Sequence, residues 1–456
     1  MRAEFRQRKS NLFDQKSLPP IDGDEAKIHI PWSFRAFKPD LSRRLRKLYS
    51  PIRFHSAEFP SGMPLILTGK ANRVVAPLVM DGENVTDATQ DLFEMAAFTQ
   101  VRKNLGPNVE SLSVLGVFND ERQDNPSVKE LPGEMIAAIL SDMAEVREEF
   151  MPVSLVSAQS SWTLSTVDLM KIAGVKTYVA VDRHSYKAAE QYEAAGIETV
   201  NLTTAKLMVE NLRKNLFLKE NLKTVIAGVD FGNLALAKKL SEEEGFDLAI
   251  IRKHRIATLD GTPSKTVHEL VYGDVRGKRV LLMDDMIGSG GTIFNTVDEL
   301  LKNGAAEVIV CASQAVFAGK EYYAKLQEIL KNDKVKLVMT SDTLPLERPT
   351  RGKDRSLPYI LVPGGNGRLQ KREVAMLEVD DFIAYIVGVM LLNPTADGVA
   401  KAMGEHVLEL SDPYDLYYQI TGKKVPRPVI THEYLEGGRH APIEKVLADL
   451  KKPKPR

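Results

Sequence analysis

The sequence predicts an α/β fold made of two units, each a mostly parallel sheet flanked by helices. Two observations predict this fold. Short β-rich runs alternate with helical stretches from about Lys27 to Leu392, which is the order of βαβ units in a parallel sheet. The alternation also extends over roughly 350 residues, more than one domain of ordinary size contains. We place the boundary between the units near residue 205.

The elements follow from residue periodicity and from residues that end helices. Strands are predicted at 109–118, 177–182, 223–230, 247–253, 278–285 and 306–313. Helices are predicted at 134–150, 205–216, 233–245 and 291–304, the last two ending at Gly245 and Gly304. The longest apolar run, 382–392, has 11 residues. It is too short to cross a bilayer and predicts a buried helix.

The composition argues against several classes of function. Apolar residues make up 43% and charged residues 27% of the 456 residues, as in an ordinary globular protein. Lysine plus arginine equals aspartate plus glutamate, 61 each, which argues against bulk electrostatic binding to nucleic acid or membrane. The one cysteine, Cys311, excludes an intrachain disulfide and fits a reducing, cytoplasmic compartment. The first residues lack the apolar core of a secretory signal.

One run, "VLLMDDMIGSGGTI" (280–293), carries the pattern of a binding site. Ligands of open α/β sheets bind at the carboxyl ends of strands, where Asp284 and Asp285 are expected and where two carboxylates can accept hydrogen bonds from a sugar diol. The turn after them exposes backbone N–H groups at a helix N-terminus, a cradle for phosphate. Its residues are Gly288, Ser289, Gly290, Gly291 and Thr292. The run predicts a ribose-phosphate site; the alternative is an acidic turn before a capped helix.

This run resembles the phosphoribosyl-pyrophosphate (PRPP) loop that type I phosphoribosyltransferases share with ribose-phosphate pyrophosphokinases, the PRPP synthetases. Further segments resemble the pyrophosphokinases alone. They are "VFNDERQDN" (117–125, ATP segment), "VAVDRHS" (179–185, metal–ATP segment), "AGVDFGN" (227–233, magnesium turn), "IIRKHRI" (250–256, root of a mobile catalytic loop) and "MTSDTLPL" (339–346, late strand end). Their order matches across about residues 30–395, so the sequence is identified as a divergent member of the ribose-phosphate pyrophosphokinase family with extra C-terminal segments.

The resemblance implies two tandem type I phosphoribosyltransferase-like domains. The expected limits are a flexible tail at 1–26, a nucleotide-side domain at 27–205, a ribose-phosphate domain at 206–400 and an extension at 401–456. The family usually assembles into dimers and larger rings, so the resemblance also implies a homo-oligomer.

The implied reaction transfers the pyrophosphoryl group of ATP, or of another nucleoside triphosphate, to O1 of ribose 5-phosphate, giving PRPP and AMP. Mg²⁺ is the implied cofactor. The run at 280–293 would bind ribose 5-phosphate. The implied residues are Lys253 and Arg255 for catalysis, Phe59, Arg122, Gln123 and His184 for the nucleotide, and His184 and Asp230 for the metal.

These residues also have plain structural interpretations. Arg122 and Gln123 could lie in a solvated turn. His184 alone has no partner spacing that supports a metal ligand, and Lys253 and Arg255 could be charges that protect an edge strand. The joint order of the segments favours the site.

The sequence departs from the family in four places. Ser61 and Met63 replace the Asp and Glu that read the adenine amino group in the family, so the nucleotide preference stays open. Gly288 stands where many synthetases have an aspartate, and Asn233 replaces a glycine, although asparagine tolerates left-handed backbone better than most residues. Residues 346–373 form a longer loop than expected, and no counterpart of the segment after Gly404 is recognised.

Two other functions stay open. One is a non-catalytic or regulatory relative that binds nucleotide or ribose phosphate, which the altered adenine turn motivates. The other is a type I phosphoribosyltransferase, which would need neither the first domain nor His184.

Overall fold

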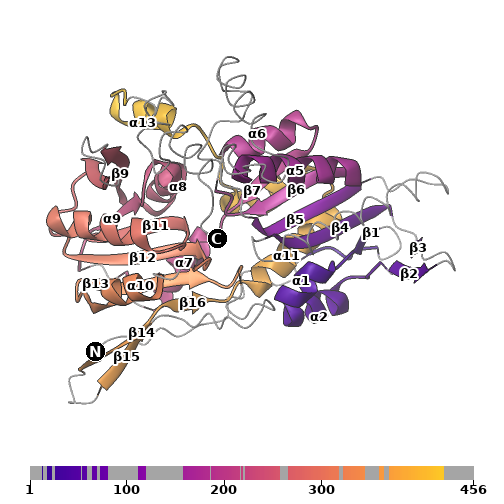
Figure 1. The fold of residues 1–456 in the computed structure, drawn as a ribbon, viewed down its shortest axis with the longest axis horizontal. Coiled ribbons are helices and arrows are strands. Elements are labelled where there is room, and N and C mark those ends of the chain that lie inside the picture. The colour runs from indigo at the N-terminus through magenta and orange to yellow at the C-terminus, as the bar shows by residue number, and fades with distance from the viewer. Residues whose placement is uncertain are drawn as a thin grey trace, which may run out of the picture.

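The computed structural model contains two α/β units that lie side by side (Figure 1). It describes residues 13, 18–22, 26–52, 54–58, 64–68, 72–80, 111–119, 158–184, 186–215, 217–218, 221–256, 265–317, 322–344, 359–363 and 369–425. The two-unit α/β architecture predicted from the sequence is therefore confirmed, and no helix in these ranges is long and apolar enough to cross a membrane.

The first sheet is parallel throughout and has five strands in the order β1-β4-β5-β6-β7. The strands are β1 (Ala26–Ile28), β4 (Arg73–Met80), β5 (Ser111–Asn119), β6 (Val175–Val181) and β7 (Glu198–Leu202). Successive side chains of β4 point to opposite faces of the sheet, so they pack in two different hydrophobic cores. Val74 and Leu78 pack with residues of α5 (Ala158–Ala173) and α6 (Tyr186–Ala194). Val75 and Val79 pack with α1 (Trp32–Phe37) and α2 (Pro39–Leu48).

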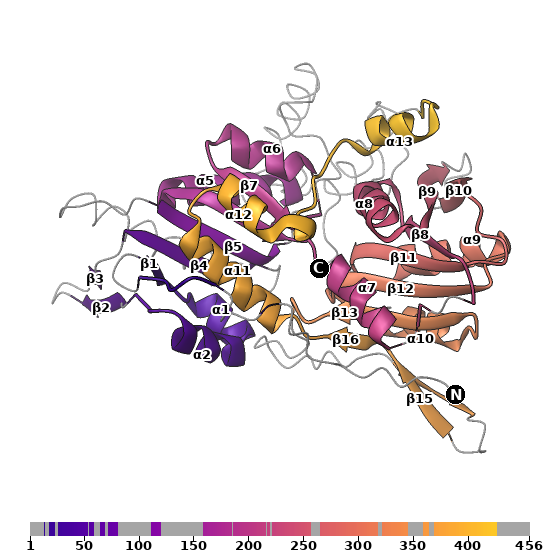
Figure 2. The ribbon, with the colours of Figure 1, turned by 180° about the vertical axis from the view of Figure 1, so that it is seen from behind.

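The second sheet has seven strands in the order β10-β9-β8-β11-β12-β13-β16, and only the β9–β10 pair is antiparallel. The strands are β8 (Thr224–Gly228), β9 (Asp247–Ile256), β10 (Lys265–Tyr272), β11 (Arg279–Met286), β12 (Glu307–Gln314), β13 (Val335–Ser341) and β16 (Ala375–Leu377). One face packs on α9 (Gly291–Lys302) and α10 (Tyr322–Lys331). The other packs on α7 (Ala205–Lys214) and α8 (Leu234–Glu244), in a core continuous with that of the first unit (Figure 2).

Local predictions agree with the elements that form. β11 is buried along its whole length because it lies between β8 and β12, which explains its uninterrupted apolar run before the carboxylates. Gly245 ends α8 in the left-handed region, at φ 68°. The helix predicted at 134–150 lies outside the described residues.

The buried helix predicted at 382–392 forms as α11 (Asp380–Leu392). We assigned residues up to 400 to the second unit, but α11 and the following α12 (Ala396–Met403) pack on the strands of the first sheet. The Tyr49 hydroxyl donates to the Ala384 carbonyl over 2.7 Å, and Gly388 leaves room for the Tyr49 ring. The chain therefore returns to its first unit after completing the second sheet.

Two further expectations differ from the structure. The expected flexible tail, 1–26, places Phe13 against Phe382 and Tyr385, with ring centroids 5.0 and 5.3 Å apart, so this part of the tail is packed on α11. The expected loop at 346–373 contains an antiparallel pair, β14 (Tyr359–Pro363) and β15 (Leu369–Glu373), which projects from the second unit (Figure 1). A second antiparallel pair, β2 (Phe54–Glu58) and β3 (Pro64–Thr68), projects from the first.

A buried ion cluster joins the start of α2 to the second unit. Lys38 Nζ lies 3.0 Å from Asp342, after β13, and 2.8 Å from Asp380, at the start of α11, and its side chain is only 4% exposed. Burial alone would lower the pKa of Lys38, but the two carboxylates raise it above its ordinary value, so the lysine stays charged.

Replacing Lys38 tests this cluster. Lys38→Ala leaves two half-buried carboxylates without their cation and is expected to lower the free energy of unfolding by about 3 kcal/mol. Arg43→Ala, which removes an exposed pair with Asp40 on α2, is the control and is expected to cost about 0.5 kcal/mol or less. Urea unfolding measures both. Equal midpoints for the two variants would contradict the assignment.

Candidate active site

Two carboxylates stand at the carboxyl end of β11, as predicted. Asp284 and Asp285 are each 7% exposed. The Asn233 side-chain amide donates to Asp284 Oδ1 over 3.0 Å, and the backbone N–H of Asp285 donates to the same oxygen over 3.0 Å. Asn233 has φ −93° and ψ 10°, so it does not use the left-handed region; its role here is to orient Asp284.

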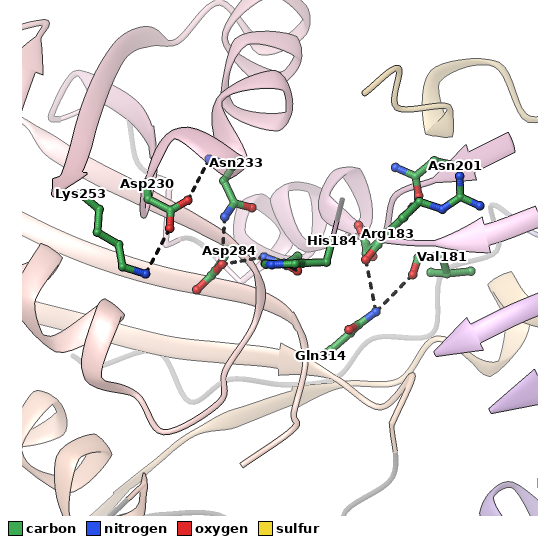
Figure 3. Close-up of polar contacts among 12 residues, drawn as sticks. Val181, Arg183, His184, Asn201, Asp230, Asn233, Lys253, Asp284 and Gln314 are labelled. Atoms are coloured by element: carbon green, nitrogen blue, oxygen red, sulfur yellow. Dashed lines mark hydrogen bonds and ion pairs between the residues drawn. The ribbon is translucent and has the colours of Figure 1, made fainter. Parts of the chain in front are cut away.

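The first unit contributes a histidine to this carboxylate pair. His184 Nδ1 lies 2.5 Å from Asp285 Oδ2, across the boundary between the units. Figure 3 shows His184 directed from the first unit toward the neighbouring Asp284. Burial would raise the pKa of Asp285, but His184 lowers it to about 2 by its charge and hydrogen bond. Burial, followed by the neighbouring Asp285 charge, raises the pKa of Asp284 well above its ordinary value. The site thus contains one firmly ionised carboxylate beside one that holds a proton more readily.

Asp230 and Lys253 form the other side of the site. Asp230 follows β8 and caps the short helix η4 (Phe231–Asn233), accepting the Gly232 N–H over 2.9 Å. Lys253 Nζ, from β9, lies 3.7 Å from Asp230 Oδ2 (Figure 3). Both side chains are partly exposed, 36% for Lys253 and 26% for Asp230, so both are accessible to a ligand.

The predicted phosphate cradle lies at the start of α9. Gly290 is the N-cap residue with φ 77°, no side chain caps the helix, and its first turn has no acidic residue. The first backbone N–H groups of α9 therefore have no carboxylate competing with an anion. A Cβ atom on Gly291 would lie 3.3 Å from Lys325 Nζ, which belongs to α10. Lys325 has no signal in the sequence that points to this site, because only the packing of α10 on α9 brings the cation to the loop.

The segment that carries His184 is fixed by buried polar contacts. Asp182 has φ 50° and accepts from the hydroxyls of Thr203 and Thr204, each over 2.7 Å. The Gln314 side chain, at the end of β12, donates to the carbonyl oxygens of Val181 and Asp182 over 3.2 and 3.3 Å (Figure 3). Non-glycine residues at positive φ are uncommon and often lie at functional sites. Here the contacts fix the direction of His184.

A cavity opens beside these groups, between the two units. Its lining residues are Asp182, Arg183, His184, Gly232, Asn233, Leu236, Asp285, Leu408 and Leu410. Polar residues from both units and apolar residues from the C-terminal extension thus share one cavity.

The predicted nucleotide residues other than His184 and the predicted catalytic residue Arg255 are not among the contacts above. Phe59, Arg122 and Gln123, together with Ser61 and Met63, lie outside the described residues. Arg255 lies in β9 opposite Thr266 of β10. Their predicted roles stay predictions.

The residues present fit a magnesium ion. Mg²⁺ takes oxygen ligands, keeps several waters and needs few protein carboxylates when it also binds phosphates. Asp230 offers a partly exposed carboxylate beside Lys253. Among the described residues no three His, Cys, Asp or Glu side chains are grouped closely enough to hold a metal without such help.

Comparison with known proteins agrees with this geometry. Residues 201–343 match the phosphoribosyl transferase domain family. Ribose-phosphate pyrophosphokinase of Streptomyces coelicolor is 33% identical over 178 residues, 39% of this chain and 51% of the relative. That of Ralstonia nicotianae is 25% identical over 300 residues, 62% of this chain and 86% of the relative. The chain spans about half the length of the first curated relatives it matches.

A solved structure extends the likeness to both units. Phosphoribosylpyrophosphate synthetase from Mycobacterium smegmatis aligns with a TM-score of 0.52 over 81% of this chain and 99% of that one, at 18% identity. At this identity the alignment shows the fold, two tandem phosphoribosyltransferase-like domains. The relatives above and this structure thus make the chain similar to ribose-phosphate pyrophosphokinases in parts of its sequence and in the fold of both units.

Proposed function

We propose that the protein is a ribose-phosphate diphosphokinase. It would transfer the pyrophosphoryl group of ATP, or of another nucleoside triphosphate, to O1 of ribose 5-phosphate. The observation that carries this proposal is the 2.5 Å contact between His184 and Asp285. It brings the segment that resembles a nucleotide site against the loop that resembles a ribose-phosphate site, so both substrates can meet in one cleft.

In this proposal the second unit binds the sugar. Asp285, and Asp284 oriented by Asn233, would accept hydrogen bonds from the ring diol. The backbone N–H groups of residues 289–292 and the hydroxyls of Ser289 and Thr292 would bind the 5-phosphate. The Lys325 ammonium would add positive charge. The sugar O1 would then be directed toward the cleft that Lys253 and His184 face.

The chemical step would be an in-line displacement. O1 of ribose 5-phosphate attacks the β-phosphorus of the nucleotide and loses its proton, and the bond from that phosphorus to the α-phosphate oxygen breaks, releasing AMP. Such steps depend mainly on positioning and charge neutralisation. Lys253, and Arg255 two residues further along β9, would neutralise the transferring group. Asp230 and His184 would hold Mg²⁺, which when bound shields the polyphosphate charge.

Two further properties are part of the proposal. A cytoplasmic location fits the single cysteine, Cys311, which is fully buried. A homo-oligomer is expected from the family, and light scattering on the purified protein would determine the mass of the assembly.

A product assay tests the activity directly. Purified protein with ribose 5-phosphate, Mg²⁺ and ATP, GTP, CTP or UTP in turn is expected to yield PRPP and the matching nucleoside monophosphate, detected by mass spectrometry. EDTA should abolish the products. PRPP from none of the four nucleotides, in a folded protein that still binds ribose 5-phosphate, would reject the activity in favour of a regulatory relative. If PRPP forms only from a nucleoside monophosphate and pyrophosphate, with release of a free nucleobase, the protein is a phosphoribosyltransferase.

Lys253→Ala tests the transition-state role. We expect kcat to fall by roughly 100-fold or more, with little change in the KM for nucleotide, because the lysine would act on charge that develops during transfer. Lys238→Ala, on the exposed face of α8 in a pair with Glu242, is the control and should keep full activity. Unchanged kcat in Lys253→Ala would remove this residue from the mechanism.

Asp284→Asn tests the contact with the sugar. The substitution preserves shape and an acceptor for Asn233 but removes the carboxylate. Affinity for ribose 5-phosphate, measured by calorimetry without nucleotide, should fall roughly 10- to 100-fold, as for the loss of a charged hydrogen bond. Asp274→Asn, at a 71% exposed side chain, is the control. Equal affinity in Asp284→Asn and the wild type would contradict the sugar-binding role.

A further inference from the structure

Residues 404–425, here called the C-terminal segment, contact both units. The segment first runs beside the end of β7. Val407 bridges Leu202 in antiparallel fashion, the Thr203 N–H donates to the His406 carbonyl over 2.8 Å, and the Leu408 N–H donates to the Asn201 carbonyl over 2.9 Å. It then crosses to the second unit, where α13 (Pro413–Thr421) packs on α8 and η4 (Figures 1 and 2).

An aromatic cluster forms where α13 meets η4. The Phe231 ring stacks on Tyr417, with centroids 5.1 Å apart and planes 25° apart, and makes an edge contact with Tyr414 at 5.6 Å. Tyr417 is 3% and Phe231 8% exposed. These buried contacts fix the Phe231 side chain against α13.

Phe231 belongs to the turn that carries two residues of the candidate site. Asp230 precedes it and faces Lys253, and Asn233 follows two positions later and holds Asp284. The turn is a single three-residue 3₁₀ helix, whose short hydrogen bonds give it little stability of its own. The position of Asp230 therefore depends on what holds Phe231.

The segment is also held on the nucleotide side. The Tyr186 hydroxyl, two residues after His184, donates to Asp412 Oδ2 over 2.9 Å. Asp412 caps α13, accepting the N–H groups of Tyr414 and Asp415 over 2.9 and 3.1 Å. One carboxylate thus fixes the start of α13 and joins it to α6 of the first unit.

We propose that the C-terminal segment completes the active site, with Tyr417 as a positioning residue that acts through Phe231 on Asp230. The inference rests on the proposed function for its ligand, a nucleoside triphosphate with its divalent cation. α13 packs mainly on α8 and η4, which do not include the ribose-phosphate loop, so the affinity for ribose 5-phosphate should depend on Tyr417 less than the affinity for the nucleotide does.

The test measures binding without turnover. Calorimetry with Mg²⁺–ATP and no sugar compares the wild type, Tyr417→Ala and, as a matched control on the same helix, Tyr418→Ala, whose residue is 49% exposed. Tyr417→Ala should weaken binding about 10-fold, Tyr417→Phe should restore it, and Tyr418→Ala should match the wild type. In Tyr417→Ala the affinity for ribose 5-phosphate should fall by less than the affinity for Mg²⁺–ATP, and in Tyr417→Phe and Tyr418→Ala it should match the wild type.

A double-mutant cycle separates positioning from general loosening. If Tyr417 acts through Asp230, the double variant Tyr417→Ala plus Asp230→Asn should bind Mg²⁺–ATP as strongly as Asp230→Asn alone, because the effects of interacting residues are not additive. If Tyr417→Ala does not fold, Tyr417→Leu replaces it, because leucine keeps a large apolar contact. Tyr417→Leu should lower the affinity for Mg²⁺–ATP about 3-fold. Added to Asp230→Asn, it should lower that affinity no further.

The outcomes are distinct. Wild-type affinity in Tyr417→Ala, additive losses, equal weakening of ribose 5-phosphate, or a wild type that does not bind Mg²⁺–ATP would each overturn the inference. The predicted binding pattern in a protein that forms no PRPP would uphold the inference and reject the proposed diphosphokinase activity.

Discussion

The candidate site depends on one constraint: the carboxyl ends of two parallel sheets meet, and their buried polar groups must find partners there. Gln314 reaches across to the carbonyl groups of Val181 and Asp182, and Thr204 shares its hydroxyl between Asp182 and Ser313. An unsatisfied buried polar group costs about 1–3 kcal/mol. These contacts therefore stabilise the arrangement of the units that brings His184 to Asp285.

This constraint also sets the charge of the site. Adjacent buried carboxylates repel each other, and one cation, here His184, cannot stabilise both of them equally. His184 lies against Asp285 and lowers its pKa, while the donors to Asp284 within the described part of the chain are neutral, the Asn233 amide and a backbone N–H. The two aspartates are neighbours in sequence but differ in environment because one faces the first unit and the other the turn after β8.

The sequence predicts what depends on local order and misses what depends on packing. The sequence predicts β11, the two carboxylates after it and the glycine turn before α9, because the residue type at each of these positions determines its local structure. The return of α11 to the first sheet is not readable, because an apolar helix of this kind fits either unit. Lys325 and the aromatic partner of Tyr417 are not readable for a related reason: Lys325 reaches the loop only when α10 packs on α9, and Tyr417 meets Phe231 only when α13 packs on η4. Asn233 shows a third case, because its side chain, and not its backbone freedom, explains the substitution.

The aromatic residue beside Asp230 has a physical explanation in the fold. A large aromatic side chain in an exposed turn would leave apolar surface in water, at about 25 cal/mol per Å². Phe231 is instead buried by Tyr414 and Tyr417 of α13, and α13 keeps its place because Asp412 is bound to Tyr186 in the first unit. The aromatic residue and the C-terminal segment thus require each other. An extension that looks peripheral in the sequence is, in the folded chain, part of the wall of the cleft.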